Sequence, residues 1–218
     1  MPTTIGTMPA AVQDARTTES VRAAEREHYD PAWTLRQART RYFEDNGFGA
    51  DGGYNARWVK LKLGPIPYAI PNTAGRVRAV RYHDLHHIMT GYRTDWMGEF
   101  EISAWEVGSG CRNLVAAWVL NLGGMFGGMF LSPRRTYRAF VRGRNTRNLY
   151  GRPFDDALLD ARVGEMRAEL GLDRDVPAGT PEDLRRFLAF LVPGLPMVAL
   201  VSAPLLVPFV GLAVWLLA

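Results

Sequence analysis

Three of the four histidines in this chain fall within five residues, in the stretch HDLHH that begins at His83. Successive residues of a helix turn by about 100°, so His83 and His87 would lie about 40° apart on one face. We expect Asp84 to lie between them, within reach of both. Two imidazoles at this spacing can bind one metal ion. His86 would point elsewhere and is the weaker candidate ligand.

A carboxylate further along the chain could complete this site. On a continuous helix Glu99 would lie about 18 Å from His87, which is too far. Gly91, however, predicts the end of a helix, and Thr94 or Asp95 predicts the N-cap of the next one. We therefore expect an antiparallel neighbouring helix to carry Glu99 back to the histidines.

Two imidazoles with one or two carboxylates suit zinc, iron, manganese or cobalt and leave open positions for water or substrate. A divalent metal would satisfy the polar side chains of His83, Asp84, His87 and Glu99 together. Glu106 lies about two turns beyond Glu99 on the same face, where it could support a ligand or face the substrate. Glu99 and Glu106 are the expected catalytic carboxyls. The alternative is a pair of core histidines bonded to Asp84 and Glu99 without a metal.

The elements that position these residues are mostly helical. Val77, Val80, Asp84 and His87 share one helical line, so the polar pair should face the core, where buried charges need partners. We expect helices over residues 30–47, 73–90, 94–107, 114–131 and 154–171, a short extended segment over 58–63 and a proline-rich loop over 64–72. Asp30 and Asn72 are the expected N-caps of the first two helices, and Pro31 the first residue of the first.

Two further segments have open interpretations. Residues 114–131 are apolar except for Asn121 and four glycines, Gly123, Gly124, Gly127 and Gly128. Glycines at this spacing permit close helix contact, either in a buried interface or inside a membrane. The arginines of residues 134–147 follow, and they could form a solvated face, contact anionic lipid or hold a phosphate.

The composition limits the class of protein. At 218 residues the chain fits one domain, and a single cysteine, Cys111, excludes an internal disulfide or a cysteine-rich zinc site. The net charge of +4 comes mostly from arginine, but no nucleic-acid recognition motif occurs, so we expect no nucleic-acid partner. The fold class expected is mainly α, a single helical domain.

The two ends of the chain differ from the middle. Residues 1–20 read as a disordered lead-in, residues 21–175 as the helical metal-binding domain and residues 176–186 as a linker. Residues 187–218 contain no charged side chain. This stretch is longer than the roughly 20 apolar residues that span a bilayer. We expect this tail to associate with a membrane, with Arg185 and Arg186 holding the domain on the cytoplasmic side. A buried C-terminal helical hairpin is the alternative.

The motif as a whole resembles a known signature. His83, Asp84, His87 and Glu99 form the pattern His-Asp-x-x-His-x11-Glu, within RYHDLHHIMTG and TDWMGEFEISAWEVG. This pattern resembles that of the coenzyme Q biosynthesis protein 4 family. The likeness extends more loosely to RYFEDNGF, RGRNTRNLYG and MRAELGL.

That resemblance implies a helical protein acting late in ubiquinone biosynthesis. It implies a divalent metal at the four motif residues and C1 decarboxylation with hydroxylation of a polyprenylated benzoate head group. It also implies association with the inner membrane and with other quinone-biosynthesis enzymes. The expected partners are thus a polyprenylated quinone precursor and membrane lipid, and a homodimer is possible.

Two other functions remain open from the sequence. A metal phosphohydrolase of the His-Asp type would need an earlier histidine and a later aspartate, for which His28 and either Asp155 or Asp160 are available. A non-catalytic scaffold or prenyl-lipid-binding protein of the quinone-biosynthesis complex would need no metal, or only a structural one.

Overall fold

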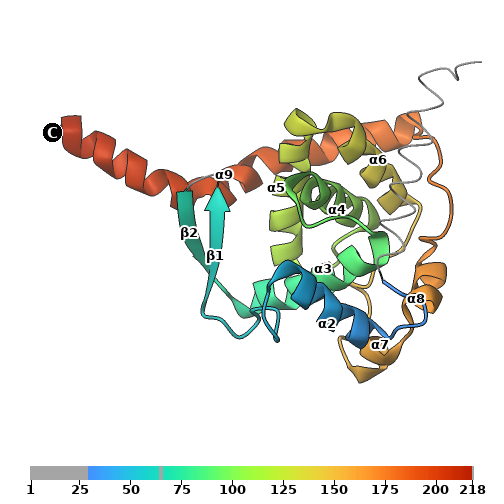
Figure 1. The fold of residues 1–218 in the computed structure, drawn as a ribbon. Coiled ribbons are helices and arrows are strands. Elements are labelled where there is room, and N and C mark those ends of the chain that lie inside the picture. Colours follow the sequence, from blue (N-terminus) through green and yellow to red (C-terminus); the bar gives the residue numbers. More distant parts are fainter. Residues whose placement is uncertain (1–28, 64–65, 218) are drawn as a thin grey trace, which may run out of the picture.

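Helices make up most of the chain, as expected (Figure 1). A computed structural model describes the backbone of residues 29–63 and 66–217 and the side chains of residues 29–60 and 69–199. The expected lead-in of residues 1–20 lies outside the described residues. The elements are α2 (Leu35–Asn46), β1 (Trp58–Leu63), β2 (Ile66–Pro71), α3 (Ala74–Thr90), α4 (Trp96–Ser109), α5 (Val115–Leu131), α6 (Pro133–Arg144), α7 (Asp156–Asp160), α8 (Val163–Leu170) and α9 (Pro181–Leu217).

The reversal between α3 and α4 is confirmed. Gly91 adopts the left-handed conformation (φ 74°) and donates its N–H to the carbonyl of His87, which ends α3. Asp95 then accepts a hydrogen bond from the N–H of Gly98 and begins α4. At the start of α3 the cap is Thr73, not Asn72 as predicted. The side-chain amide of Asn72 instead donates to backbone carbonyls of the loop before β1.

Helix α2 begins later than the prediction at Asp30. Its N-cap is Thr34, which forms a capping box with Gln37. The Asp30 carboxylate accepts the N–H of Ala32 within a turn before the helix. The predicted end at Gly47 is confirmed, because this residue has a φ of 66°.

The predicted loop over residues 64–72 is wrong for residues 66–71. Residues Ile66–Pro71 form β2, which pairs antiparallel with β1 from Trp58 opposite Pro71 to Leu63 opposite Ile66. In a two-stranded sheet each strand has an open edge, so a proline can occupy a position without an inter-strand N–H. The hairpin projects from the helical part of the molecule (Figure 1).

The predicted helix over residues 154–171 is split into α7 and α8. Ala161 between them is extended (ψ 147°), and its carbonyl accepts the N–H of Leu35 at the start of α2. Val163 in turn donates its N–H to the carbonyl of Trp33. These tertiary hydrogen bonds take the place of a helical turn, which local sequence does not reveal.

Helix α4 packs against both α5 and α6, and glycines permit the close approach. A side chain at Gly108 or Gly143 would collide with the backbone of the facing helix, α6 or α4. A side chain at Gly124 of α5 would collide with the side chain of Ser103 of α4, and one at Gly128 with the side chains of Thr136 and Phe100. The glycine-rich segment is therefore a buried helix interface.

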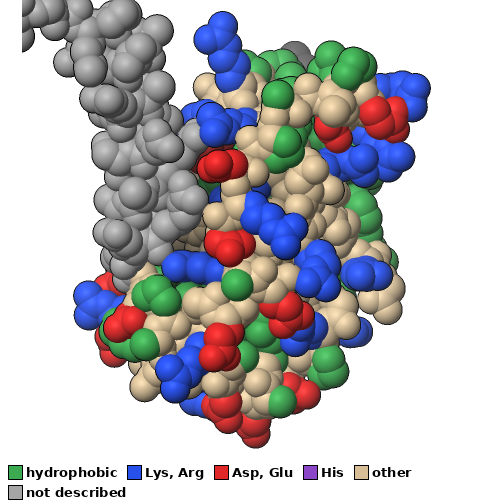
Figure 2. All heavy atoms as spheres, turned by 90° about the vertical axis from the view of Figure 1, so that its right-hand side faces the viewer, with side chains coloured by type: hydrophobic (Ala, Val, Ile, Leu, Met, Phe, Trp, Pro, Cys, Tyr) green, Lys and Arg blue, Asp and Glu red, His purple; other side chains and the backbone are tan. Residues whose placement is uncertain are grey.

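The arginines that follow are used mainly within the protein. Arg135 pairs with Glu101, Arg144 pairs with Asp183, and Arg142 donates to the carbonyl of Thr90. Arg134 and Arg138 are exposed. On the face formed by α6, α8 and the start of α9, basic and acidic side chains are interspersed (Figure 2). The segment is thus not a uniformly solvated face.

Helix α9 begins at Pro181, inside the predicted linker of residues 176–186. Phe187 is buried and contacts the rings of Tyr137 and Phe140. The expected start of the tail at residue 187 therefore lies within the packed part of the helix, and α9 continues as one helix in place of a hairpin (Figure 1). No helix in the described part of the chain is both long and apolar enough to cross a bilayer.

Candidate metal centre

His83 and His87 lie on one face of α3, as their spacing predicts. Their Nε2 atoms are 3.1 Å apart, and each is 3.3 Å from an oxygen of Glu99, which α4 carries back against α3. Ligand atoms at about 2.0–2.1 Å from a tetrahedral ion are separated by about 3.3 Å from one another. These three residues therefore have the spacing of ligands around one small cation, and His83, His87 and Glu99 could hold a metal ion.

The other nitrogen of each ring fixes how the rings present themselves. Nδ1 of His87 lies 2.8 Å from the carbonyl oxygen of Tyr92, which can only accept, so this nitrogen carries a hydrogen. Nδ1 of His83 lies 3.0 Å from a carboxylate oxygen of Glu106 and is likewise a donor. In the neutral rings both Nε2 atoms then carry lone pairs directed at the Glu99 carboxylate. Such a set of converging acceptors requires a cation, either a proton or a metal ion.

Exposure changes across this cluster. The side chains of Glu106 and His87 are 0% and 2% exposed, that of His83 is 20% exposed and that of Glu99 is 41% exposed. The site is therefore closed at its base and open to solvent beside Glu99. A bound metal would keep coordination positions for water or substrate on that side.

The charges of the cluster reinforce one another. Burial alone would lower the pKa of His83, but the carboxylates of Glu106 and Glu99 outweigh burial and raise the pKa well above its usual range. Burial would also raise the pKa of Glu99, whereas the two facing histidines hold the pKa well below its ordinary value. Without a metal, a proton on His83 thus occupies the place of the cation, and Glu99 is an anion.

Glu106 lies at the closed base of the cluster. Its carboxylate is fully buried and accepts four hydrogen bonds, from Nδ1 of His83, Nδ1 of His86 (2.6 Å), the hydroxyl of Tyr150 (2.6 Å) and the amide of Asn121. Burial opposes its charge, but the neighbouring histidines hold its pKa well below the usual range. Of the two roles open to Glu106, supporting a ligand is the one that this geometry fits, because such an acceptor fixes the tautomer and orientation of His83.

His86 lies outside the cluster, as expected from its direction on the helix. Its Nε2 accepts the N–H of Leu149 at 3.0 Å, while its Nδ1 donates to Glu106. Burial is the main reason that its pKa is lowered. His86 is therefore a neutral core histidine that links α3 to the segment after α6.

Asp84 is not brought together with the other three predicted ligands. Its carboxylate accepts a 2.5 Å hydrogen bond from the hydroxyl of Tyr54, and the group that could hold a metal ion consists of His83, His87 and Glu99. The reason is helical geometry: one residue turns by about 100°, so Asp84 lies beyond the pair in angle and not between its members. Burial raises the pKa of Asp84.

The residues required for a His-Asp phosphohydrolase do not join the cluster either. Asp155 is the N-cap of α7, and Asp160 accepts hydrogen bonds from Arg36. His28 lies outside the described residues. The structure supplies no additional carboxylate ligand from α7.

Several supporting groups could not be chosen from the sequence alone. Asn121 could have been recognised from the sequence as a supporting residue, since it is the only polar side chain in an otherwise apolar and glycine-rich helix. Tyr150 and the backbone carbonyl of Tyr92 could not be recognised in this way. The role of Tyr150 depends on where a distant segment lies, and the role of Tyr92 depends on the orientation of one peptide group. Sequence reasoning therefore found the cluster but missed most of its supports.

Comparison of the chain with protein-family models gives no match, and neither curated proteins nor solved structures give a significant one. The likeness to a family therefore depends only on the motif and the looser segments around it.

Proposed function

We propose that this protein is a metal-dependent enzyme of ubiquinone biosynthesis that removes the C1 carboxylate of a polyprenylated benzoate head group. The observation that carries the proposal is the convergence of three acceptors, Nε2 of His83, Nε2 of His87 and the Glu99 carboxylate, at the spacing of metal ligands. The motif that these residues share with the coenzyme Q biosynthesis protein 4 family supports the choice of reaction. Hydroxylation at the same carbon would need an oxidant in addition.

The side chains of the site suit this chemistry. A bound divalent metal would supply a Lewis acid that polarises the carboxylate or phenolate of the head group. His83 and His87 would hold it from the closed side of the site, with their orientation fixed by Glu106 and by the carbonyl of Tyr92. Glu99 lies at the open side, where its carboxylate can accept or return a proton during the reaction.

Zinc is the metal we favour. Two imidazoles and one carboxylate are a ligand set that catalytic zinc adopts, and the short separations of the ligand atoms fit a four-coordinate ion. Iron, manganese and cobalt accept the same donors. Elemental analysis of the purified protein distinguishes them.

The membrane is the proposed place of action, on the cytoplasmic side of the inner membrane, because the polyprenyl substrate resides there. Leu188, Val192 and Leu195 of α9 are 50%, 76% and 60% exposed, so apolar surface continues along the helix toward the C-terminal end. Since Phe187 is part of the core, the informative deletion removes residues 200–218 and leaves the packed half of α9 intact. We expect this variant to leave the membrane fraction on sedimentation; unchanged sedimentation would refute membrane attachment through the tail.

The decisive experiment is His87→Ala in a strain that depends on this protein for its quinone. We expect the purified variant to retain almost no metal and the strain to accumulate a carboxylated, prenylated precursor, detected by mass spectrometry of lipid extracts. Arg134→Ala, a change at an exposed position on α6, is the matched control and should retain both metal and quinone. If His87→Ala stays folded, keeps its place in the cell and still supports quinone synthesis, the protein is a scaffold or lipid carrier instead.

A further inference from the structure

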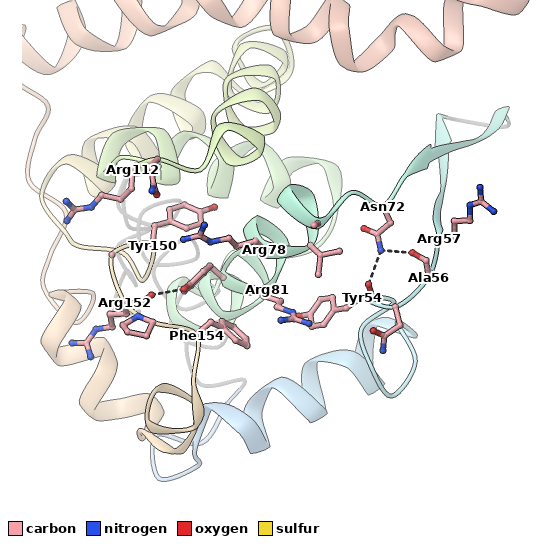
Figure 3. A pocket seen from close by; sticks show the side chains of 17 residues that line it. Tyr54, Ala56, Arg57, Asn72, Arg78, Arg81, Arg112, Tyr150, Arg152 and Phe154 are labelled. Carbon is pink, nitrogen blue, oxygen red and sulfur yellow. Dashed lines mark hydrogen bonds between the residues drawn. The ribbon is translucent and has the colours of Figure 1, made fainter.

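A hollow of about 1300 Å³ lies beside α3 (Figure 3). Because each residue of a helix rotates by about 100°, Arg78 and Arg81 lie about 140° or more from His83 around the axis of α3. The hollow is lined by residues from the loop before β1, from α3, from the loop before α5 and from the segment after α6. None of His83, His87 and Glu99 lines it, although Tyr150 of its lining donates to Glu106 beneath the metal cluster.

The lining of this hollow has one sign of charge. Five arginines contribute to it and no aspartate or glutamate does, among the residues that the structure describes; they are Arg57, Arg78, Arg81, Arg112 and Arg152. Figure 3 shows Arg78 and Arg81 in the middle, between Tyr150 and Phe154 on one side and Tyr54 on the other. Like charges gathered in one concave site repel one another and attract an anion.

Most of these arginines lack an acidic partner. Arg152 pairs with Glu169, but Arg57, Arg78 and Arg112 form no ion pair within the described part of the chain. The guanidinium of Arg81 lies over the rings of Tyr54 and Phe154, at 5.3 and 5.7 Å from their centroids. This contrasts with the arginines of α6, several of which are neutralised within the protein.

The backbone of Arg112 has an unusual conformation. Its φ of 51° is the only positive value outside glycine among the described residues. A residue other than glycine is held in this region only where surrounding contacts enforce it, and such positions are common at ligand sites. The carbonyl of Arg112 accepts the indole N–H of Trp118 at 2.9 Å, which fixes the loop beside the hollow.

We propose that this hollow binds a phosphate or diphosphate group, with Arg78 and Arg81 as its central contacts and Arg112 at its margin. Guanidinium groups bind phosphate oxygens through paired, charge-assisted hydrogen bonds. The aromatic side chains of Tyr82 and Phe154, which contact each other edge to face, form a rigid wall beside them. The volume leaves room for the rest of a phosphorylated molecule.

The test is a calorimetric titration of the purified full-length protein with pyrophosphate. We expect binding that weakens with salt and that falls by at least about ten-fold in Arg78→Ala, since one charge-assisted contact is lost. Arg78 is exposed, so this change should leave thermal unfolding unaltered. The control is Arg134→Ala, which removes the same charge from an exposed position on α6 outside the hollow and should bind pyrophosphate like the parent protein.

Two further arms identify the source of the phosphate and exclude the metal centre. If pyrophosphate does not bind, but vesicles of phosphatidylcholine with phosphatidic acid bind better than pure phosphatidylcholine vesicles and Arg78→Ala abolishes the difference, the ligand is a lipid head group and the proposal stands. His87→Ala should bind pyrophosphate unchanged. The proposal is overturned if neither probe binds, if Arg78→Ala and Arg134→Ala lose affinity equally, or if binding depends on His87 and not on Arg78.

Discussion

The two sides of α3 are charged in opposite senses. On one side His83 and His87 meet Glu99 and Glu106, and the acceptor atoms of His83, His87 and Glu99 converge on one point where a proton or a metal ion can lie. On the other side Arg78 and Arg81 line a hollow that has no aspartate or glutamate among its lining residues, and the charged groups there are N–H donors. One helix therefore separates a site suited to a cation from a site suited to an anion.

The comparison shows what distinguishes a ligand site from an ordinary polar cluster. Glu106 and His86 are also buried and polar, but every acceptor and donor of theirs has a partner inside the protein. They stabilise the fold and need nothing further. The other two sites differ from this. In the cluster at Glu99 hydrogen-bond acceptors face one another, and in the hollow at Arg78 positive charges lie together without an acidic partner.

Glu106→Ala should have the largest effect, because it leaves four buried donors without their common acceptor. We expect the free energy of unfolding to fall by about 3 kcal/mol and metal affinity to fall by about 10- to 100-fold as His83 loses its orientation. Urea unfolding and competitive metal titration measure the two effects. Pyrophosphate binding in the hollow should be unchanged if the two sides of α3 are independent.

Glu106→Gln is the matched variant. Its remaining carbonyl can still accept from His83 and His86, while Tyr150 and Asn121 can reorient toward the new amide, so the loss of stability should be about 1 kcal/mol. If the alanine variant is no less stable than the glutamine variant, the four hydrogen bonds do not support the cluster as described.

Acid should weaken the metal side selectively. Glu106 and Glu99 raise the pKa of His83 in the metal-free protein against the opposing effect of burial, so a metal ion must displace a proton from this ring. The stabilisation of the protonated, metal-free form is present at low pH and is lost as pH rises through the raised pKa. Metal affinity should therefore increase with pH, by up to about ten-fold per pH unit where one proton is released.

Titration calorimetry in two buffers that differ in ionisation enthalpy counts the protons released. A value near zero at neutral pH would mean that His83 is already neutral in the metal-free protein.

Asp84→Asn should have the smallest effect. The asparagine carbonyl can accept the hydroxyl of Tyr54 in place of the carboxylate, so metal content should stay at the parental level. Because burial raises the pKa of Asp84 in the folded protein, its ionisation opposes folding at neutral pH and not in acid. We expect the variant to be as stable as the parent or slightly more so at pH 7, by urea unfolding. Loss of metal would restore Asp84 as a ligand.

Much of the cluster was predictable because it depends on local rules. The spacing of His83 and His87, the stop at Gly91 and the cap at Asp95 together required Glu99 to return toward the histidines, and it does. The prediction that Asp84 joins the histidines was wrong. The angle around the helix, and not closeness in sequence, decides which side chains converge.

Other features could not be predicted because they depend on distant partners. The strand Ile66–Pro71 exists through its pairing with β1, and the break at Ala161 exists through hydrogen bonds to the start of α2. The hollow draws its arginines from segments far apart in the chain, each of which alone resembles an ordinary solvated charge.

The sequence by itself determined that the protein is mainly helical and that two histidines and a glutamate can share one cation, because helix periodicity and capping act over a few residues. Only the tertiary structure decided that Glu106 closes the base of that site, that Asp84 turns to Tyr54, and that uncompensated arginines meet beside α3. Electrostatic partnership depends on distances between segments, and these are set by packing.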